Sequence, residues 1–409
     1  MTEDDNRSLL VPTEDTDRPV PNVAIVATAS CYPANRIDPE DIYGIISTSY
    51  DSSPVYELSQ GYLVRTILEK ILEINKKSKI QHRHSSLPDD HPYWKESKIP
   101  TISECDLLFK KYGIPMAEEA ANKALQDWGG SLNDITHMVV VTCTNTANPG
   151  LDYLLSQRLG LHRNVQRSLI HGIGCAGGVA ALRTANELLL GRAALKKPGR
   201  ALVVACEMTT IFLRTELAYI VSDDEVHIGP TLFGDGAGAL ILSNEIEIQP
   251  TESRSLWKIL NVQSTTLEDS AGCLEFNVHA HGYHAVISKD VPKHISSSLF
   301  PAFQDLIAST PSLNLLETNF DPCNYDWALH PGGYGILLLA QEILGISEHH
   351  LRKSYNVYRM RGNTSSATIL SVIKELADEE KATGTGRDKV VVAAFGPGIT
   401  IEMAVMARV

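Results

Sequence analysis

Three residues far apart in the chain have side chains suited to nucleophilic catalysis: Cys175, His330 and Asn363. Cys175 stands in SLIHGIGCAGG, between a short apolar segment and a glycine-rich stretch typical of a helix start. At a helix N-terminus, backbone N–H groups and the helix dipole favour the thiolate, which is the nucleophilic form of cysteine. A buried structural thiol in a tight turn fits this stretch equally well, so the stretch alone does not decide between the two.

A thiolate nucleophile needs a partner, and His330 is the histidine best placed to be one. It ends the apolar segment DWALH and precedes the turn PGGYG, whereas most of the 14 histidines lie in polar segments. Asn363 lies in RGNTSSAT, at a junction between a loop and a helix. Taken singly, His330 is equally well interpreted as a satisfied core histidine, and Asn363 as an ordinary helix N-cap.

The elements that would position these residues form two comparable α/β halves. Segments LFGDGAGALIL (232–242) and AFGPGITIEMAV (394–405) both run Phe-Gly-x-Gly into an apolar strand, 162 residues apart. This repeat favours a duplicated α/β fold with layered sheets. The polar, His- and Pro-rich segment 80–100 is expected to be a surface loop.

Hydrophobic periodicity predicts the individual elements. Apolar, β-branched segments indicate buried strands. The predicted strands are 22–30, 137–144, 168–174, 200–210, 236–244, 257–266, 326–330 and a pair within 389–407. The predicted helices are most of 39–76, then 114–129, 151–160, the segment after Cys175, 292–309, 334–345 and 364–380.

Charge and cysteine usage disfavour several classes of protein. The formal net charge of −13 argues against a nucleic-acid partner. Seven cysteines without a C-x-x-C pair argue against a zinc ribbon or a disulfide scaffold and favour a reducing compartment. Residues 1–21 are acidic and lack the apolar core of a signal peptide, so they predict a disordered tail. We expect a cytoplasmic protein with no membrane partner.

Several motifs, taken in order, resemble one enzyme family. GCAGGVAALR, LHPGG and GNTSSA resemble the Cys-His-Asn motifs of the type III polyketide synthases, the chalcone synthase-like enzymes. The 33-residue spacing of His330 and Asn363 matches that family, and TNTANPGLDYLLSQRLGL (144–161) resembles its segment before the nucleophile. The amino-acid sequence around Cys175 is most similar to that of fungal members of the family. The similarity covers about residues 22–408, apart from apparent insertions near 84–100, 190–199 and 308–326.

The resemblance implies a thiolase-like, duplicated αβαβα fold and a homodimer. After the tail, an N-terminal half (22–245) would carry Cys175, and a C-terminal half (246–409) would carry His330 and Asn363. It also implies iterative decarboxylative condensation of malonyl-CoA onto an acyl-CoA starter held on Cys175. A fatty acyl or β-ketoacyl starter is expected, with cyclisation to alkylpyrone, alkylresorcinol or resorcylic acid-type products. CoA thioesters would be substrates, and no cofactor is implied.

Two alternatives remain open at this stage. A ketoacyl synthase III-type condensing enzyme uses the same three residue types but takes its substrate from an acyl carrier protein. A catalytically dead thiolase-fold scaffold is the second alternative, and the intact set of three residues argues against it.

Family positions also surround the expected site. Phe233 falls at the gatekeeper position, where an apolar ring disfavours the malonyl carboxylate and so favours loss of CO2. Ala285 stands where a second gatekeeper phenylalanine is expected, which predicts a roomier pocket. Core packing is the alternative role for Phe233. Positions that resemble the lining of the cyclisation cavity are Glu207, Ser365, Cys143, Thr144 and Phe212, although a structural, hydrogen-bonded role suits Glu207 equally well.

The remaining predicted contacts concern CoA and a turn. Lys70 and Lys77 match CoA-contacting positions, but Glu73 replaces an arginine between them, and a solvated helix face is the alternative. Gly396 and Gly398 belong to the family's signature turn. The segment HAHGYH (279–284) has no accompanying acidic or cysteine ligand pattern, so we expect no metal site there.

Overall fold

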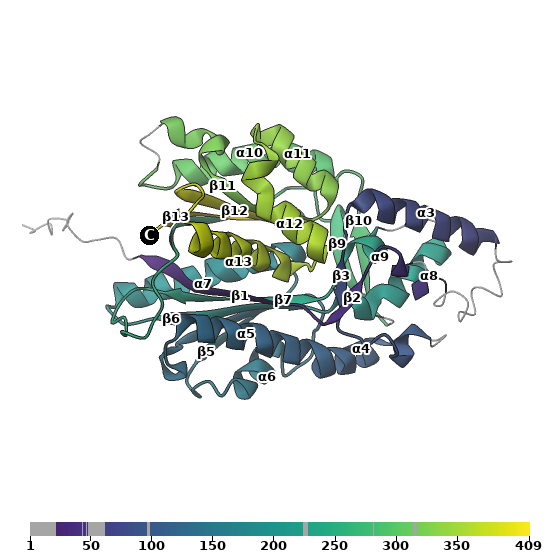
Figure 1. The fold of residues 1–409 in the computed structure, drawn as a ribbon, viewed down its shortest axis with the longest axis horizontal. Coiled ribbons are helices and arrows are strands. Elements are labelled where there is room, and N and C mark those ends of the chain that lie inside the picture. The colour runs from purple at the N-terminus through teal and green to yellow at the C-terminus, as the bar shows by residue number, and fades with distance from the viewer. Residues whose placement is uncertain are drawn as a thin grey trace, which may run out of the picture.

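The computed structural model describes residues 22–42, 44–45, 47, 62–95, 99–223, 228–280, 282–313 and 317–409. Its centre is a nine-stranded sheet in the order β11-β12-β13-β8-β1-β7-β6-β4-β5 (Figure 1). The predicted tail and residues 48–61 of the predicted first helix lie outside the described ranges.

The sheet consists of two equivalent sets of strands. In the N-terminal set, β4 is parallel to β6, and β6-β7-β1 continue antiparallel. In the C-terminal set, β11 is parallel to β12, and β12-β13-β8 continue antiparallel. A short antiparallel pairing of β1 with β8 joins the sets. The strands are β1 (Val23–Cys31), β4 (His137–Val141), β5 (Gln166–Ile170), β6 (Arg200–Glu207), β7 (Gly236–Ser243), β8 (Trp257–Thr266), β11 (Asp326–Leu329), β12 (Lys389–Gly396) and β13 (Thr400–Arg408).

The strand order explains the repeat in the sequence. The two Phe-Gly-x-Gly segments lead into β7 and β13, which hold equivalent places in the two sets. The predicted duplication is therefore confirmed.

Helices complete five layers. Two helices, α7 and α13, pack together in the middle and contact strands of both sets (Figure 1). Helix α5 covers the outer face of the N-terminal set beside α6, while α10 and α12, with α11, cover the C-terminal set. This is the predicted αβαβα arrangement. The helices are α5 (Ile114–Trp128), α6 (Leu151–Arg158), α7 (Gly177–Ala194), α10 (Val291–Ala308), α11 (Tyr334–Leu344), α12 (Arg352–Arg361) and α13 (Ser366–Thr383).

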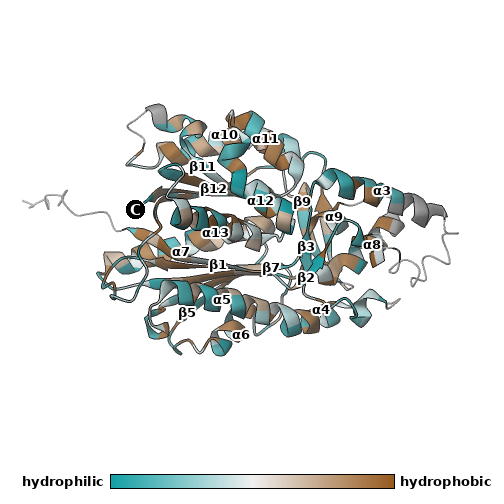
Figure 2. Ribbon diagram, in the orientation of Figure 1, coloured by the Kyte–Doolittle hydropathy of each residue, from teal (hydrophilic) through white to brown (hydrophobic). Residues whose placement is uncertain are grey.

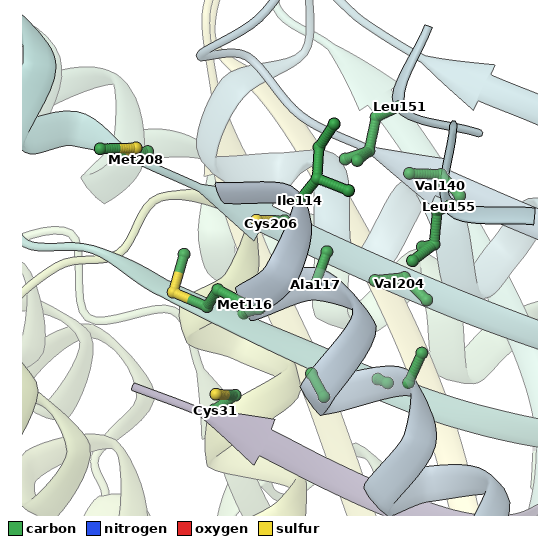
Figure 3. Close-up of a cluster of buried hydrophobic side chains, with 14 of the residues drawn as sticks. Cys31, Ile114, Met116, Ala117, Val140, Leu151, Leu155, Val204, Cys206 and Met208 are labelled. Carbon is green, nitrogen blue, oxygen red and sulfur yellow. The ribbon is translucent and has the colours of Figure 1, made fainter. Parts of the chain in front are cut away.

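Burial of apolar side chains holds the layers together. The central strands are brown along their length in Figure 2, whereas the outer helices show teal outward-facing residues. Figure 3 shows Ile114, Met116 and Ala117 of α5 next to Val140 of β4 and Val204 of β6. Close packing of this kind leaves little freedom to the ends of the strands, which is where the candidate site lies.

The prediction that residues 80–100 form a surface loop is wrong in part. Strand β3 (Arg83–Ser85) pairs with β2 (Asn35–Ile37), and all three β3 residues are buried. Their polar groups are satisfied inside: His84 Nδ1 lies 2.8 Å from the Pro33 carbonyl oxygen, and Arg83 Nη1 donates to that of Pro230 at 2.8 Å. Polar composition predicted exposure here because these partners lie far away along the chain.

Sequence patterns missed a group of elements that lies beside the ends of the sheet strands. Helices α3, α8 and α9 and the hairpin β9–β10 form one end of the molecule, at the right of Figure 1. They are α3 (Tyr62–Ser78), α8 (Leu213–Asp223), α9 (Gly229–Leu232), β9 (Leu274–His279) and β10 (Gly282–Ile287), of which only α3 was partly predicted. A further missed helix, α4 (Ile102–Leu108), precedes α5. Within the described ranges, every helix is too short or too polar to span a bilayer.

Candidate active site

The fold brings Cys175, His330 and Asn363 to one cavity. Cys175 lies in a one-turn 3₁₀ segment (Gly174–Ala176) that runs directly into α7. His330 directly follows β11, and Asn363 lies just before α13. Helices α7 and α13 pack against each other, and their N-termini meet, since a Cβ added to Gly178 would lie 2.4 Å from the Ser366 carbonyl oxygen. All three residues line a cavity of about 670 Å³, here called the outer cavity.

The predicted turn at Gly396 and Gly398 supports the loop that carries Cys175. A Cβ added to Gly396 would lie 2.3 Å from the Ile173 carbonyl oxygen, and one added to Gly174 would lie 2.6 Å from the Pro397 ring. Only glycine allows backbones to approach this closely. Gly398 has φ +61, a left-handed conformation that also favours glycine. This turn therefore fixes the position of the loop that carries Cys175.

Asn363 is held by its backbone and by one side-chain atom. Its N–H donates to the Leu232 carbonyl at 3.0 Å, and its own carbonyl accepts from Gly234 N at 3.0 Å. These two bonds form an isolated bridge with Phe233, which places the predicted gatekeeper beside the asparagine. Asn363 Oδ1 accepts from the Ser365 N–H at 2.7 Å. The amide Nδ2 is consequently the donor left for the cavity.

Burial controls the charge state of the cysteine and the histidine. His330 is 1% exposed, and neither ring nitrogen has a hydrogen-bond partner within the described part of the chain. Burial lowers the pKa of His330 to about 3 and raises the pKa of the Cys175 thiol to about 11. Both pKa shifts oppose the expectation that Cys175 rests as a thiolate. Either charge would be stabilised only if the other formed with it.

A second cavity, here called the inner cavity, meets the outer one at the nucleophile. Cys175 and Phe233 line both, so the thiol stands where the cavities join. The inner cavity has a volume of about 90 Å³, although residues from many segments line it, so it is a narrow slot. The predicted positions that line it are Cys143, Phe212, Ala285 and Ser365.

Comparison with known proteins identifies the family. Residues 56–245 match the profile of chalcone and stilbene synthases, N-terminal domain, and residues 258–409 match that of the C-terminal domain. The chain belongs to the chalcone and stilbene synthase family. It is therefore a type III polyketide synthase, and the ketoacyl synthase III and scaffold alternatives are disfavoured.

Several relatives of this synthase are fungal. It is 46% identical to the acylalkylpyrone synthase csyB of Aspergillus oryzae, over 97% of each chain. It is 34% identical to the type III polyketide synthase pspB of Penicillium soppii, over 95% of this chain and 97% of that one. The solved structure of CsyB complexed with CoA-SH superimposes with a TM-score of 0.89 at 46% identity, covering 95% of this chain and 100% of CsyB. The fungal type III synthase ORAS gives a TM-score of 0.86 at 37% identity, with the same coverage.

Aromatic packing narrows the inner cavity of the synthase. The Phe212 ring lies 4.6 Å from that of Tyr283 and 5.8 Å from that of Phe276, measured between centroids. The Tyr283 and Phe276 rings stack at 4.8 Å. Phe276 pairs with Ala285 across the hairpin, so these rings pack beside Ala285 and narrow the cavity there. That Ala285 makes the pocket roomier than a phenylalanine would stays a prediction.

Glu207 and Thr144 lie one layer behind the cavity wall, and neither lines either cavity. The Glu207 carboxylate is fully buried and accepts from Cys143 N at 3.1 Å and from Thr144 Oγ1 at 2.9 Å. Burial raises the pKa of Glu207, and these hydrogen bonds oppose that shift. The link to the nucleophile is indirect: Cys143 Sγ and Cys175 Sγ each lie 3.5 Å from Ser365 Oγ. The structural role left open for Glu207 therefore agrees with its position.

Only one of the two predicted CoA lysines reaches a cavity. Lys77 lines the outer cavity and forms an exposed ion pair with Glu73 at 2.6 Å. Lys70 is exposed on α3 and lines neither cavity. Lys289, which no sequence pattern above marked as a CoA contact, lines the outer cavity as well. Two cations thus flank an otherwise mostly apolar entrance.

Proposed function

We propose that this type III polyketide synthase extends a fatty acyl-CoA or β-ketoacyl-CoA starter with malonyl-CoA and closes the product to a pyrone. The observation that carries the proposal is the position of Cys175 at the junction of two cavities. The outer cavity suits a CoA thioester, and the narrow inner slot suits a linear chain better than a bulky aromatic one. The name of csyB, an acylalkylpyrone synthase, and its complex with CoA-SH support the same substrate class.

Loading uses the cysteine and histidine together. The Cys175 proton passes to His330 while Sγ attacks the starter thioester carbonyl, so that the two charges form as a pair. The C–S bond to CoA then breaks, and the proton on His330 passes to the leaving thiolate. This order is consistent with a site in which burial disfavours either charge alone.

Decarboxylation uses hydrogen-bond donors rather than a base. Neutral His330 has one ring N–H, and Asn363 Nδ2 is a second donor; both would be directed at the malonyl thioester oxygen. Loss of CO2 leaves an enolate whose oxygen these donors stabilise. The enolate carbon attacks the acyl group on Cys175, the C–Sγ bond breaks, and the chain, two carbons longer, is now a CoA thioester. The Cys175 thiolate then attacks this thioester, so that the chain returns to Cys175 and CoA leaves. CoA thioesters are the only small molecules that this scheme requires.

We further propose a homodimer. Strand β5 is an edge of the nine-stranded sheet, with Gln166 and Arg167 exposed, and its outer hydrogen-bonding groups are unpaired by any described strand. An exposed edge of this kind favours pairing with a second chain. Sedimentation of the purified protein tests this: a monomer would contradict the proposal.

The test of the activity is direct. Purified protein is incubated with malonyl-CoA and a panel of acyl-CoAs without any carrier protein, and product masses are read. We expect pyrones that carry the alkyl chain of long, unbranched starters. Turnover of only short or aromatic starters would contradict the chain class, and a strict need for acyl carrier protein would contradict the use of CoA thioesters.

A further inference from the structure

The segment HAHGYH has no role in the mechanism above. Apart from His281, which lies outside the described residues, the segment belongs to the hairpin β9–β10, and no group of three or more metal-ligating side chains occurs in the parts of the chain that the structure describes. Its last histidine instead lies against a carboxylate. His284 Nδ1 is 3.5 Å from Glu216 Oε1, and the His284 ring packs on Tyr219 at 4.2 Å between centroids.

Glu216 faces the inner cavity. It lies in the first turn of α8, is 6% exposed, and lines the slot together with Cys175 and Ala285. Its Oε1 accepts the Ala285 N–H at 2.9 Å, which ties the carboxylate to the hairpin. Its Oε2 is directed toward Gly229 and Phe233, since a Cβ added to Gly229 would lie 3.4 Å from this oxygen and 3.7 Å from the Phe233 ring.

A carboxylate in this wall has a chemical consequence. Most of the surrounding lining is apolar, including Phe212, Leu213 and Phe276. An alkyl chain gains nothing from a buried carboxylate, whereas the enol O–H of a β-keto chain can donate a hydrogen bond to it. Glu207 is less suited to this role, because it lies behind the wall and does not line the inner cavity.

We propose that Glu216 is a catalytic residue for ring closure and that His284 positions it; this rests on the pyrone synthesis proposed above. Glu216 accepts the proton of the enol near the distal end of the chain. The enol oxygen bonds to the thioester carbonyl carbon, the bond from that carbon to Cys175 Sγ breaks, and the lactone leaves. The proton on Glu216 then passes through water to the Cys175 thiolate, so that both groups return to their starting states.

Glu216→Gln tests the proposal with little change of shape. Glutamine Oε1 still accepts the Ala285 N–H, but the side chain no longer takes a proton. CoA release counts condensations, and the pyrone formed per CoA released measures closure. General-base catalysis typically contributes about 10²–10⁴-fold, so we expect that ratio to fall at least about tenfold, with linear products appearing. CoA release is compared in the first turnover, before the chain has to leave Cys175, and there it should stay within about twofold of wild type.

Controls separate closure from folding and from the parent activity. Glu119→Gln, on the exposed face of α5, should leave both readouts unchanged. His284→Asn, which alters the group beside Glu216, should lower the ratio less than Glu216→Gln does. An unchanged ratio in Glu216→Gln overturns the proposal, as does a loss of CoA release that matches the loss of pyrone. If wild-type protein makes no pyrone at all, the proposed function itself fails instead.

Discussion

The backbone N–H of Ser365 donates to Asn363 Oδ1 at 2.7 Å, which fixes which end of the asparagine amide faces the reaction. Nδ2 donates to the Gly332 carbonyl over a longer distance, 3.4 Å. Ser365 has φ +49, a left-handed conformation unusual for a residue with a side chain. The turn at Ser365 directs its backbone N–H toward Asn363 Oδ1, and it thereby leaves Asn363 Nδ2 facing the cavity as a donor.

The amide orientation predicts the effect of Asn363→Ala. Loss of one preorganised donor to a developing oxyanion costs about 10²–10³-fold in rate. We expect release of CO2 from malonyl-CoA to fall by that factor, while loading of the starter onto Cys175 changes little. Labelled CO2 release and intact-protein mass measure the two steps. An equal loss of both steps would contradict a donor role confined to decarboxylation.

The cysteine variant should separate the same steps differently. Cys175→Ala removes the acyl carrier, so no extended product should form. Decarboxylation, which depends on His330 and Asn363, should persist at a reduced rate. Product formation by this variant at the wild-type rate would show that another group holds the chain.

The pH dependence of alkylation follows from burial of the thiol. Since burial raises the pKa of Cys175 to about 11, the reactive thiolate is the minor form at neutral pH in the free enzyme. Its fraction grows about tenfold for each unit that the pH rises below that value. Iodoacetamide labelling of Cys175, followed by peptide mass, should therefore accelerate steadily between about pH 7 and 9. A rate that is already maximal near pH 7 would instead indicate a resting thiolate–imidazolium pair.

Gly396→Ala should damage the loop that carries the nucleophile. The new methyl would lie 2.3 Å from the Ile173 carbonyl oxygen and 2.8 Å from Ala176 Cβ, so the loop must move. Overpacking of this kind costs about 1–3 kcal/mol, and we expect a lower thermal midpoint and slower CoA release.

The matched control is Gly191→Ala, within α7, where an added Cβ meets nothing within 4 Å. Replacing glycine in a helix interior stabilises by about 0.5–1 kcal/mol, so this variant should melt at or above the wild-type midpoint. Wild-type stability and activity in Gly396→Ala would show that the turn does not support the Cys175 loop.

Ala285→Phe should close the inner slot. A phenyl ring added beside Phe212 and Phe276 would occupy the path that we assign to the acyl chain. We expect products to shift to shorter starters or fewer extensions, as read by product mass. Val278→Phe places the same ring on β9 of the hairpin at a position 53% exposed, and it should leave the product profile unchanged. An identical profile in Ala285→Phe would mean that the chain lies elsewhere.

Local patterns determined most of the layered core. Runs such as HMVVV and RALVVACE are apolar on both faces, which suits only strands covered by helices on both sides. The order of three motifs along the chain, which resembles that of one enzyme family, then marked Cys175, His330 and Asn363. The strand predictions succeeded because each depends on residues within a few positions of one another, and the structure brings the three marked residues to one cavity.

Other features were decided only by tertiary structure. Burial of Arg83 and His84 depends on carbonyl groups of Pro230 and Pro33, and periodicity carries no record of such partners. The placement of Glu207 behind the wall, and of Glu216 in it, follows from how α8 and the hairpin pack on the strand ends. A carboxylate looks the same in a sequence whether protein donors surround it or it borders a cavity. Which of these holds is set by contacts between segments far apart in the chain.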